Sequence, residues 1–264
     1  MPLDSSYSLS TDQIASFRQR GSIRLPDVLP NDVLDHYGPE FRRIVQQRQK
    51  KLPPMSERTT YQKAFTQVIN LWKDSDVAKE FVFGKRLARI AAELLGTRGV
   101  RIYHDQALYK EPDGGFTPWH ADQYYWPFVT EKCCTAWVPL QDTPQEMGPL
   151  GFSEGSHLVE TGRDLAISDK SEERIDSALS EAGLPYVEEP FQRGDVSFHY
   201  GWTFHRAGGN QTDRPREAMT VIYMDIDMRM KEADNEHQKP EIWCPGVSVG
   251  EVIDTPVTPV LYSE

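Results

Sequence analysis

The chain has 264 residues, of which 38% are hydrophobic, and a formal net charge of −11 at pH 7. This length and apolar content suffice for one domain with a core, whereas no apolar run approaches the roughly 18 residues that a membrane span needs. A nucleic-acid partner is disfavoured, because phosphate binding needs a basic stripe and the sequence offers only the short patch "QRQKK" at residues 47–51.

The first thirteen residues and the cysteines predict a cytoplasmic protein. The start, "MPLDSSYSLSTDQ", carries acid and serine where a signal peptide needs a basic head and an apolar stretch. Cys133 and Cys134 are adjacent and Cys244 stands alone, which provides neither a disulfide framework nor a zinc motif. We therefore expect three buried thiols.

The first third of the chain is predicted to be largely helical. Ser10 and Gln13 have the spacing of a capping box, and Gly21 supplies a stop, so a helix is expected over residues 11–20. Further elements follow in this order: a short strand within residues 22–30, a helix capped by Asn31 that Pro39 can interrupt, a loop over residues 52–62, and one helix over about residues 76–95.

From Val100 onward the pattern changes to short strand-like runs separated by Gly, Pro and Asp. These runs cover residues 100–110, 134–143, 195–207 and 216–228, and their spacing predicts a barrel or a sandwich. Residues 165–184 are polar with a modest helical period and are expected to form a surface insertion. The Pro- and Gly-rich tail, residues 241–262, is expected to wrap the body in extended form.

The stretch "TPWHADQYYWPF", residues 117–128, places His120 and Asp122 two residues apart among aromatic side chains. On a strand both would point to one side, either as a hydrogen-bonded core pair or as two ligands of a metal. His205, at the end of a later predicted strand, can supply a third ligand. Two imidazoles and one carboxylate on one face of an iron leave three positions open, as in non-haem Fe(II) oxygenases.

At these motifs the sequence resembles the phytanoyl-CoA dioxygenase family of Fe(II)/2-oxoglutarate oxygenases. The resemblance extends from the first helix to the "WCPG" of the tail. Its most specific parts are "WHAD" at residues 119–122, "GPLGFSEGSHL" at 148–158, "GDVSF" at 194–198 and "HRAGGNQTDRPR" at 205–216.

The resemblance assigns roles to individual residues. His120, Asp122 and His205 match the iron ligands, and Arg216 matches the arginine that holds the distal carboxylate of 2-oxoglutarate; Arg214 is the nearby alternative. Weaker matches to co-substrate contacts are Gln106, Trp137 and Lys63. Two departures from the pattern are Ala207, where many members carry a serine that supports this carboxylate, and Tyr200, where some carry a histidine.

The fold that the resemblance implies is mainly β with flanking helices, a double-stranded β-helix (jelly roll, cupin-like). This fold agrees with the elements predicted along the chain, which are helices in the first third and short strands after it. We expect a single domain over residues 1–264, with a helical part over about residues 1–98, a jelly-roll core over about 99–230 and an extended tail over 231–264.

The resemblance further implies Fe(II), 2-oxoglutarate and O2 as cofactors and a small organic molecule as substrate, handled by a monomer or a homodimer. Hydroxylation of a C–H bond with release of succinate and CO2 is the default, because relatives that halogenate lack the carboxylate of Asp122. Alternatives are desaturation, epimerisation or cyclisation at the same site, a metal-dependent hydrolase or cupin-type dioxygenase with no need for Arg216, and a non-catalytic metal-binding jelly roll.

Substrate contacts are predicted from strand alternation. If the strand continues past Asp122, Tyr124 and Trp126 face the metal, whereas Gln123 and Tyr125 face away. His104 and His199 lie on predicted strands and could reach the same pocket. His237 lies in a polar context and is expected to be solvated.

Overall fold

A computed structural model describes residues 3–264 and contains helices, strands and four 3-10 turns. The helices are α1 (Thr11–Arg20), α2 (Asn31–Gln49), α3 (Thr60–Ala64), α4 (Leu71–Asp74), α5 (Asp76–Val82), α6 (Lys85–Leu95), α7 (Asp169–Glu181) and α8 (Pro240–Trp243). The strands are β1 (Ser22–Leu25), β2 (Thr66–Ile69), β3 (Gly99–Lys110), β4 (Thr117–His120), β5 (Cys133–Pro139), β6 (Leu150–Ser153), β7 (Tyr186–Glu188), β8 (Val196–Tyr200), β9 (His205–Ala207), β10 (Arg216–Asp225) and β11 (Val260–Ser263). The 3-10 turns are η1 (Met55–Glu57), η2 (Asp122–Tyr125), η3 (Gln145–Met147) and η4 (Ser156–Leu158).

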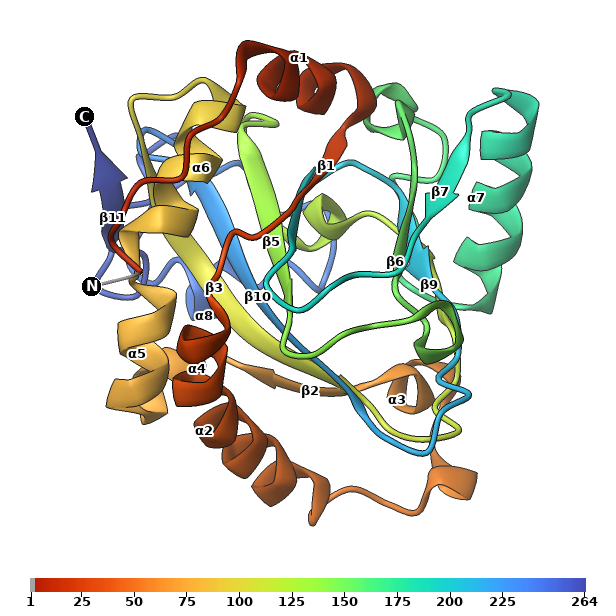
Figure 1. Ribbon diagram of the computed structural model, residues 1–264. Helices are drawn as coiled ribbons and strands as arrows, with labels where there is room; N and C mark the ends of the chain where they lie inside the picture. The colour runs from red at the N-terminus through yellow and green to blue at the C-terminus, as the bar shows by residue number, and fades with distance from the viewer. Residues whose placement is uncertain (1–2) are drawn as a thin grey trace.

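The strands form two antiparallel sheets (Figure 1). The larger sheet has the order β1-β8-β5-β10-β3-β11, and β2 also pairs with β3. The smaller sheet has the order β4-β9-β6-β7. This architecture is the double-stranded β-helix that was predicted, and consecutive strands alternate between the two sheets at several points in the chain.

Helices cover the outer face of the larger sheet (Figure 1). Helix α6 contributes most clearly, because its apolar residues recur at helical spacing and are buried against the sheet: Leu87, Ala88, Ile90, Ala91, Ala92, Leu94 and Leu95. Helices α1, α2 and α5 add to the same cluster. The main core therefore lies between helices and sheet, and the inner face of the sheet remains for a site.

Helix α7, in the segment expected as a surface insertion over residues 165–184, lies at the surface and packs one face against strand β4 of the smaller sheet. Its apolar residues Ile175 and Leu179 are buried beside Trp119. The backbone N–H of Trp119 donates to Glu172 (2.7 Å) and the indole N–H donates to Asp176 (3.1 Å). Helix α7 therefore holds the strand that carries His120.

Several predicted boundaries are confirmed, and others differ for local reasons. Helix α1 covers the expected residues, with both bonds of the capping box at Ser10 and Gly21 in the left-handed region (φ 82°). The helix expected over 76–95 is two helices, because the backbone leaves the helical conformation at Gly84 (ψ 129°), between α5 and α6. Helix α2 continues through Pro39, which removes the hydrogen bond to the carbonyl of Asp35, an exposed residue.

The run expected as one strand over residues 195–207 is two strands in different sheets, β8 and β9. They are joined at Gly201, where a Cβ would lie 2.8 Å from the side chains of both Cys133 and Gln123. The tail pairs through β11 with β3, as an extended wrap would, but also contains α8. The loop expected over residues 52–62 contains η1 and the start of α3.

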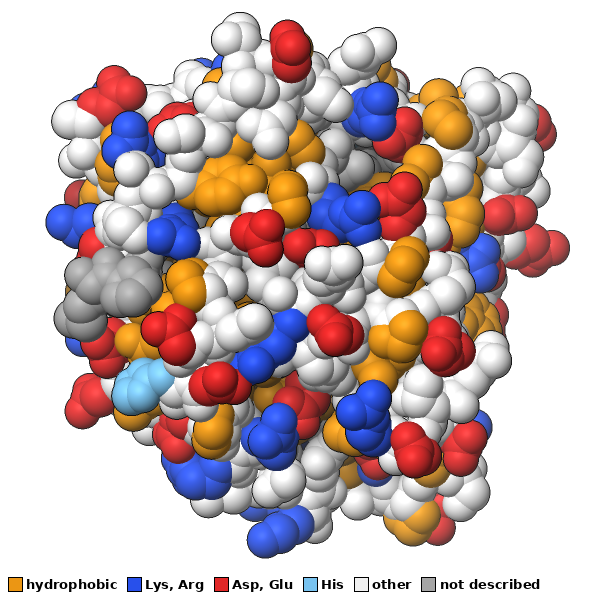
Figure 2. All heavy atoms as spheres, in the orientation of Figure 1, with side chains coloured by type: hydrophobic (Ala, Val, Ile, Leu, Met, Phe, Trp, Pro, Cys, Tyr) orange, Lys and Arg blue, Asp and Glu red, His pale blue; other side chains and the backbone are white. Residues whose placement is uncertain are grey.

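Surface features agree with the composition. Over the described part of the face in Figure 2, acidic and basic side chains are interspersed. The three cysteines are free and buried, as predicted. Within residues 3–264, the helices are all too short or too polar to cross a lipid bilayer.

Candidate active site

The two histidines of the site face each other across a strand pair. In the β4–β9 pairing His120 lies directly opposite His205, and the centroids of their rings are 4.1 Å apart. Both imidazoles are buried. Antiparallel pairing therefore brings together two residues that are far apart in the sequence.

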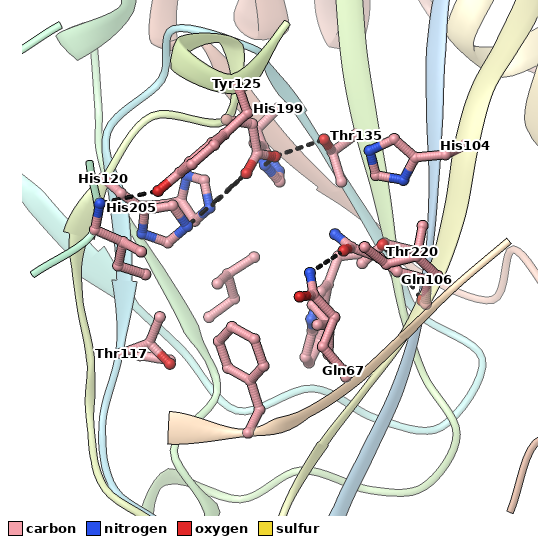
Figure 3. A pocket seen from close by; sticks show the side chains of 18 of the residues that line it. Gln67, His104, Gln106, Thr117, His120, Tyr125, Thr135, His199, His205 and Thr220 are labelled. Atoms are coloured by element: carbon pink, nitrogen blue, oxygen red, sulfur yellow. Dashed lines mark hydrogen bonds and ion pairs between the residues drawn. The ribbon is translucent and has the colours of Figure 1, made fainter. Parts of the chain in front are cut away.

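Asp122 completes a group of three possible metal ligands. Strand β4 ends at His120, and η2 turns the carboxylate back toward the histidines. Its Oδ1 atom lies 3.8 Å from Nε2 of His120 and 3.7 Å from Nε2 of His205. One ligand atom from each of the three residues lies within 4.8 Å of the other two, and Figure 3 shows both labelled imidazoles directed toward the cavity.

Backbone carbonyls orient both imidazoles. Nδ1 of His120 donates to the carbonyl of Pro118 (2.8 Å), and Nδ1 of His205 donates to the carbonyl of Thr203 (2.9 Å). A carbonyl only accepts, so each Nδ1 carries the proton and each Nε2 is left with its lone pair toward Asp122. Metal-binding histidines almost always make such a hydrogen bond through the ring nitrogen that does not bind the metal.

The other oxygen of Asp122 is fixed by two donors. The hydroxyl of Thr135 donates to Oδ2 (2.7 Å), and Nε2 of His199 lies 3.2 Å from the same atom. Oδ1 is therefore free to bind a metal. His199, which was expected to reach the pocket, lines it and is part of this support, and its Nδ1 atom is buried without a partner in the described structure.

The electrostatics of the site suit a divalent cation. Burial lowers the pKa of His120 to about 3 and that of His205 to about 4, and a neighbouring imidazole adds to each effect. Burial alone would raise the pKa of Asp122, but His205 and the hydrogen bond from His199 outweigh it, so the pKa lies below its ordinary value. At neutral pH the site thus offers two neutral imidazoles and one carboxylate.

These ligands lie on the wall of a cavity of about 210 Å³ between the two sheets (Figure 3). Arg216 also lines the cavity, almost completely buried. Nη1 of Arg216 donates to the carbonyl of Gly148 (2.8 Å), whereas its Nε is buried with no partner among residues 3–264. Arg214, in contrast, is exposed to solvent. Of the two arginines, the structure places Arg216 at the cavity.

Two of the three residues that match co-substrate contacts more weakly line the cavity. Gln106 and Trp137 line it, and the guanidinium carbon of Arg216 lies 5.6 Å from the centre of the Trp137 ring. Lys63 is not among the lining residues. It belongs to α3, and Phe65, directly after that helix, is the first residue of this segment to line the cavity.

Sequence reasoning missed Gln67, whose side-chain amide donates to Gln106 (2.6 Å; Figure 3). Alternation along β2 would have found it, because Phe65, Gln67 and Ile69 all line the cavity. The four-residue strand was too short to be recognised among polar neighbours.

The aromatic residues after Asp122 are arranged differently from the prediction. Because η2 interrupts the strand, alternation fails: Tyr125 and Trp126 line the cavity and Tyr124 does not. The Tyr125 hydroxyl accepts from the backbone N–H of Ile167 (2.9 Å). Tyr124 is half-buried and lies beside His237, with ring centroids 5.8 Å apart.

The C-terminal tail completes the wall. His237 and Trp243 both line the cavity, and His237 is also exposed to solvent, as expected. The Trp243 ring packs on His104, another predicted contact that lines the cavity, with centroids 5.3 Å apart. Asn235 and Gln238 each donate to the carbonyl of Tyr124 at 3.0 Å. These bonds fasten the tail to η2.

A family profile described as phytanoyl-CoA dioxygenase (PhyH) matches residues 17–218. The chain belongs to the PhyH family. The matched region contains the three possible metal ligands and Arg216, the residues that the structure places on one cavity.

Solved structures support the PhyH assignment over nearly the whole chain. The epimerase SnoN from nogalamycin biosynthesis, in complex with Fe³⁺, alpha ketoglutarate and nogalamycin RO, is 26% identical with a TM-score of 0.78, covering 95% of this chain and 98% of that one. The alpha ketoglutarate dependent carbocyclase SnoK from nogalamycin biosynthesis is 25% identical with a TM-score of 0.78, covering 96% of each chain.

A curated relative, phytanoyl-CoA dioxygenase domain-containing protein 1 of Danio rerio, is 25% identical over 154 residues, which are 54% of this chain and 48% of the relative. The chain thus matches about half the length of that relative. PhyH-family oxygenases depend on iron and 2-oxoglutarate, and the site fits both. It offers a facial donor set for iron and a buried guanidinium, with a free Nε, for a carboxylate.

Proposed function

We propose that this protein is an Fe(II)/2-oxoglutarate-dependent oxygenase that hydroxylates a C–H bond of a small, partly apolar organic molecule. One observation carries the proposal: a single cavity has two histidines and an aspartate in a facial arrangement and, elsewhere on its wall, a buried arginine without a counter-charge. A hydrolase or a cupin-type dioxygenase has no need for that arginine.

Each of these residues would have a distinct task. His120, Asp122 and His205 would hold the iron, and Arg216 would hold the distal carboxylate of 2-oxoglutarate through its planar fork. When bound, the two groups would let O2 act as the oxidant: one oxygen atom goes to succinate, formed with CO2 from 2-oxoglutarate, and the other goes to the hydroxylated product. The protein contributes orientation and a cavity that excludes water.

The remaining wall supports an organic substrate with apolar surface. Tyr125, Trp126 and Trp243 provide aromatic surface, and the buried imidazole of His104 provides a polar atom among them. Burial lowers the pKa of His104 to about 4, so its imidazole is neutral at pH 7. A mostly apolar wall with a few polar groups is typical of small-molecule sites.

Epimerisation or ring closure is a second candidate outcome, supported by the likeness to SnoN and SnoK over at least 95% of this chain. Isotope labelling separates the two candidates. Under ¹⁸O2, hydroxylation puts one labelled oxygen atom into the product, whereas epimerisation or ring closure does not.

Anaerobic titration tests the proposed cofactors. Adding Fe(II) and then 2-oxoglutarate should produce a visible charge-transfer band that requires both, and a screen of small molecules should then identify one that stimulates succinate release. A protein that gives no band at millimolar 2-oxoglutarate, although folded, would not be an oxygenase of this type. A band without any stimulated succinate release would favour the non-catalytic alternative.

The contact between Thr135 and Asp122 predicts a loss of iron affinity when the hydroxyl is removed. Thr135→Val should weaken Fe(II) binding about 10- to 100-fold, because partners of metal ligands contribute that much to affinity. Thr143→Val is a matched control, since this buried hydroxyl donates only to the carbonyl of Gln141 (3.2 Å) outside the site. Anaerobic titration measures the Fe(II) affinity of both variants. Equal affinities would show that the Thr135 hydroxyl does not support iron binding.

The position of Trp243 predicts an effect on coupling. Trp243→Ala should increase 2-oxoglutarate consumption without matching product, because the tail side of the cavity would admit water. The adjacent Ile242 is 53% exposed, so Ile242→Ala should leave coupling unchanged, and so should Tyr124→Ala. Succinate and oxidised substrate are measured side by side; a drop in melting temperature with intact coupling would make Trp243 a packing residue only.

A further inference from the structure

A second cation is buried beside Arg216. Lys110, the last residue of β3, is paired directly with Arg216 of β10, and its exposed fraction is 0%. Within residues 3–264, no carboxylate lies within 4.0 Å of the charged nitrogens of either side chain. Two cations thus share one buried region at the end of a strand pair without an anion between them.

This arrangement is costly unless something negative binds there. Burial and the charge of Arg216 hold the pKa of Lys110 well below its usual range, and burial lowers the pKa of Arg216 to about 10. Charges that are buried in proteins are normally paired, because the lost hydration must be replaced. An anion in the cavity would reverse both effects.

Lys110 reaches the cavity through a hydroxyl group. Its ammonium group donates to the carbonyl of Gly115 and to Oγ1 of Thr117 (3.3 Å). Thr117 lines the cavity with its side chain almost fully buried. An anion in the cavity favours the ammonium form of Lys110, which can only donate, so the Thr117 oxygen then accepts and its own proton is available. The described part of the chain provides no acceptor for that proton.

The residue opposite Thr117 cannot take that proton. In the β4–β9 pairing Thr117 faces Ala207, which also lines the cavity and has no polar side-chain atom. The hydroxyl of Thr117 and the unpartnered Nε of Arg216 are therefore two buried donors on the wall of one cavity. Together with the second cation behind the hydroxyl, they form a site for a carboxylate.

We propose that Thr117 donates a hydrogen bond to the distal carboxylate of 2-oxoglutarate beside Arg216, and that Lys110 is a positioning residue that holds the Thr117 hydroxyl and adds positive charge behind it. This proposal rests on the proposed function of the cavity. It assigns the polar contact on the β4 side of the carboxylate to Thr117, since Ala207 cannot provide one.

Equilibrium binding to the anaerobic Fe(II) protein tests the proposal without turnover. The charge-transfer band is titrated with 2-oxoglutarate for wild type, Thr117→Val, Thr117→Ser and Lys110→Met. Thr117→Val should bind roughly 10- to 100-fold more weakly, as expected for losing a hydrogen bond to a charged group. Thr117→Ser keeps the hydroxyl and should recover most of the affinity. Lys110→Met should also bind more weakly.

A keto acid without the distal carboxylate separates binding from folding. With 2-oxopentanoate, Thr117→Val and Lys110→Met should have the affinity of wild type, because the carboxylate that Thr117 contacts and Lys110 supports is missing. Thr143→Val is again the matched control and should bind both keto acids normally. Melting temperatures of the iron-free proteins show whether Lys110 matters for stability; a purely structural lysine would lower the melting temperature and leave discrimination between the two keto acids unchanged.

The possible failures are distinguishable. A wild-type protein without a band would overturn the proposed function. A normal wild-type band together with unchanged 2-oxoglutarate affinity in Thr117→Val would overturn only the assignment of Thr117. Equal weakening for both keto acids would do the same, because the effect would not depend on the distal carboxylate. Should Lys110→Met fail to fold, the comparison of Thr117→Val with Thr117→Ser still decides.

Discussion

Replacing His120, Asp122 or His205 by alanine is expected to abolish both Fe(II) binding and turnover of 2-oxoglutarate, with the fold intact. Each substitution removes one of three donors whose ligand atoms lie within 4.8 Å of one another. Two donors cannot enclose one face of the ion, and the three-ligand arrangement that leaves sites open for substrates is lost. The main apolar core lies on the other side of the larger sheet and is untouched.

The measurement is the stoichiometry of bound Fe(II) after anaerobic reconstitution, with succinate formation and circular dichroism on the same samples. His157→Ala is the matched control. This histidine is also buried, but it stacks on Tyr200 outside the cavity, with ring centroids 5.3 Å apart. A triad variant that retained one equivalent of iron and full succinate formation would remove that residue from the metal centre.

Replacing Arg216 by alanine is expected to raise the 2-oxoglutarate concentration needed for half-saturation by more than a factor of ten. Losing one partner of a buried charge pair costs about 2–5 kcal/mol, and every 1.4 kcal/mol or so is tenfold in affinity. Arg216→Lys should recover only part of the loss, because a point charge cannot reproduce the two parallel bonds of a guanidinium.

Arg214→Ala is the control for Arg216, two residues away in the sequence but exposed. The 2-oxoglutarate concentration that half-saturates Arg214→Ala should stay near the wild-type value. The two variants are compared by the charge-transfer titration and by succinate release at increasing 2-oxoglutarate. Similar values for Arg214→Ala and Arg216→Ala would mean that the carboxylate binds elsewhere in the cavity.

Local signals predicted much of the fold. The capping box at Ser10 and the glycine at position 21 define α1 because both ends are determined by contacts within a few residues. Strands β3 and β10 were predicted because strand-like runs over residues 100–110 and 216–228 are set off by Gly, Pro and Asp. The division of residues 76–95 at Gly84 was missed; the backbone there lies against Leu3, from the N-terminal end of the chain, and no local pattern contains that contact.

The site was predicted unevenly for a similar reason. His120, Asp122, His205 and Arg216 occur in motifs with fixed spacing, and the structure places all four on one cavity. Tyr124 was predicted on the wrong side, because alternation assumes a strand that the 3-10 turn η2 replaces. Contacts that come from distant segments without a repeating pattern, such as the tail residue Trp243, could not be predicted from the sequence.

The attachment of the tail to η2 has a consequence for how this protein could change. The metal donors and Arg216 come from β4, η2, β9 and β10, whereas part of the remaining wall comes from the tail segment 235–243, attached to η2 by two amide hydrogen bonds at the Tyr124 carbonyl. Loops of this kind tolerate variation better than strands. Exchange of the tail segment would then alter which molecules fit the cavity while the parts that bind iron and 2-oxoglutarate stay constant, so new substrates can be acquired without rebuilding the oxidising centre.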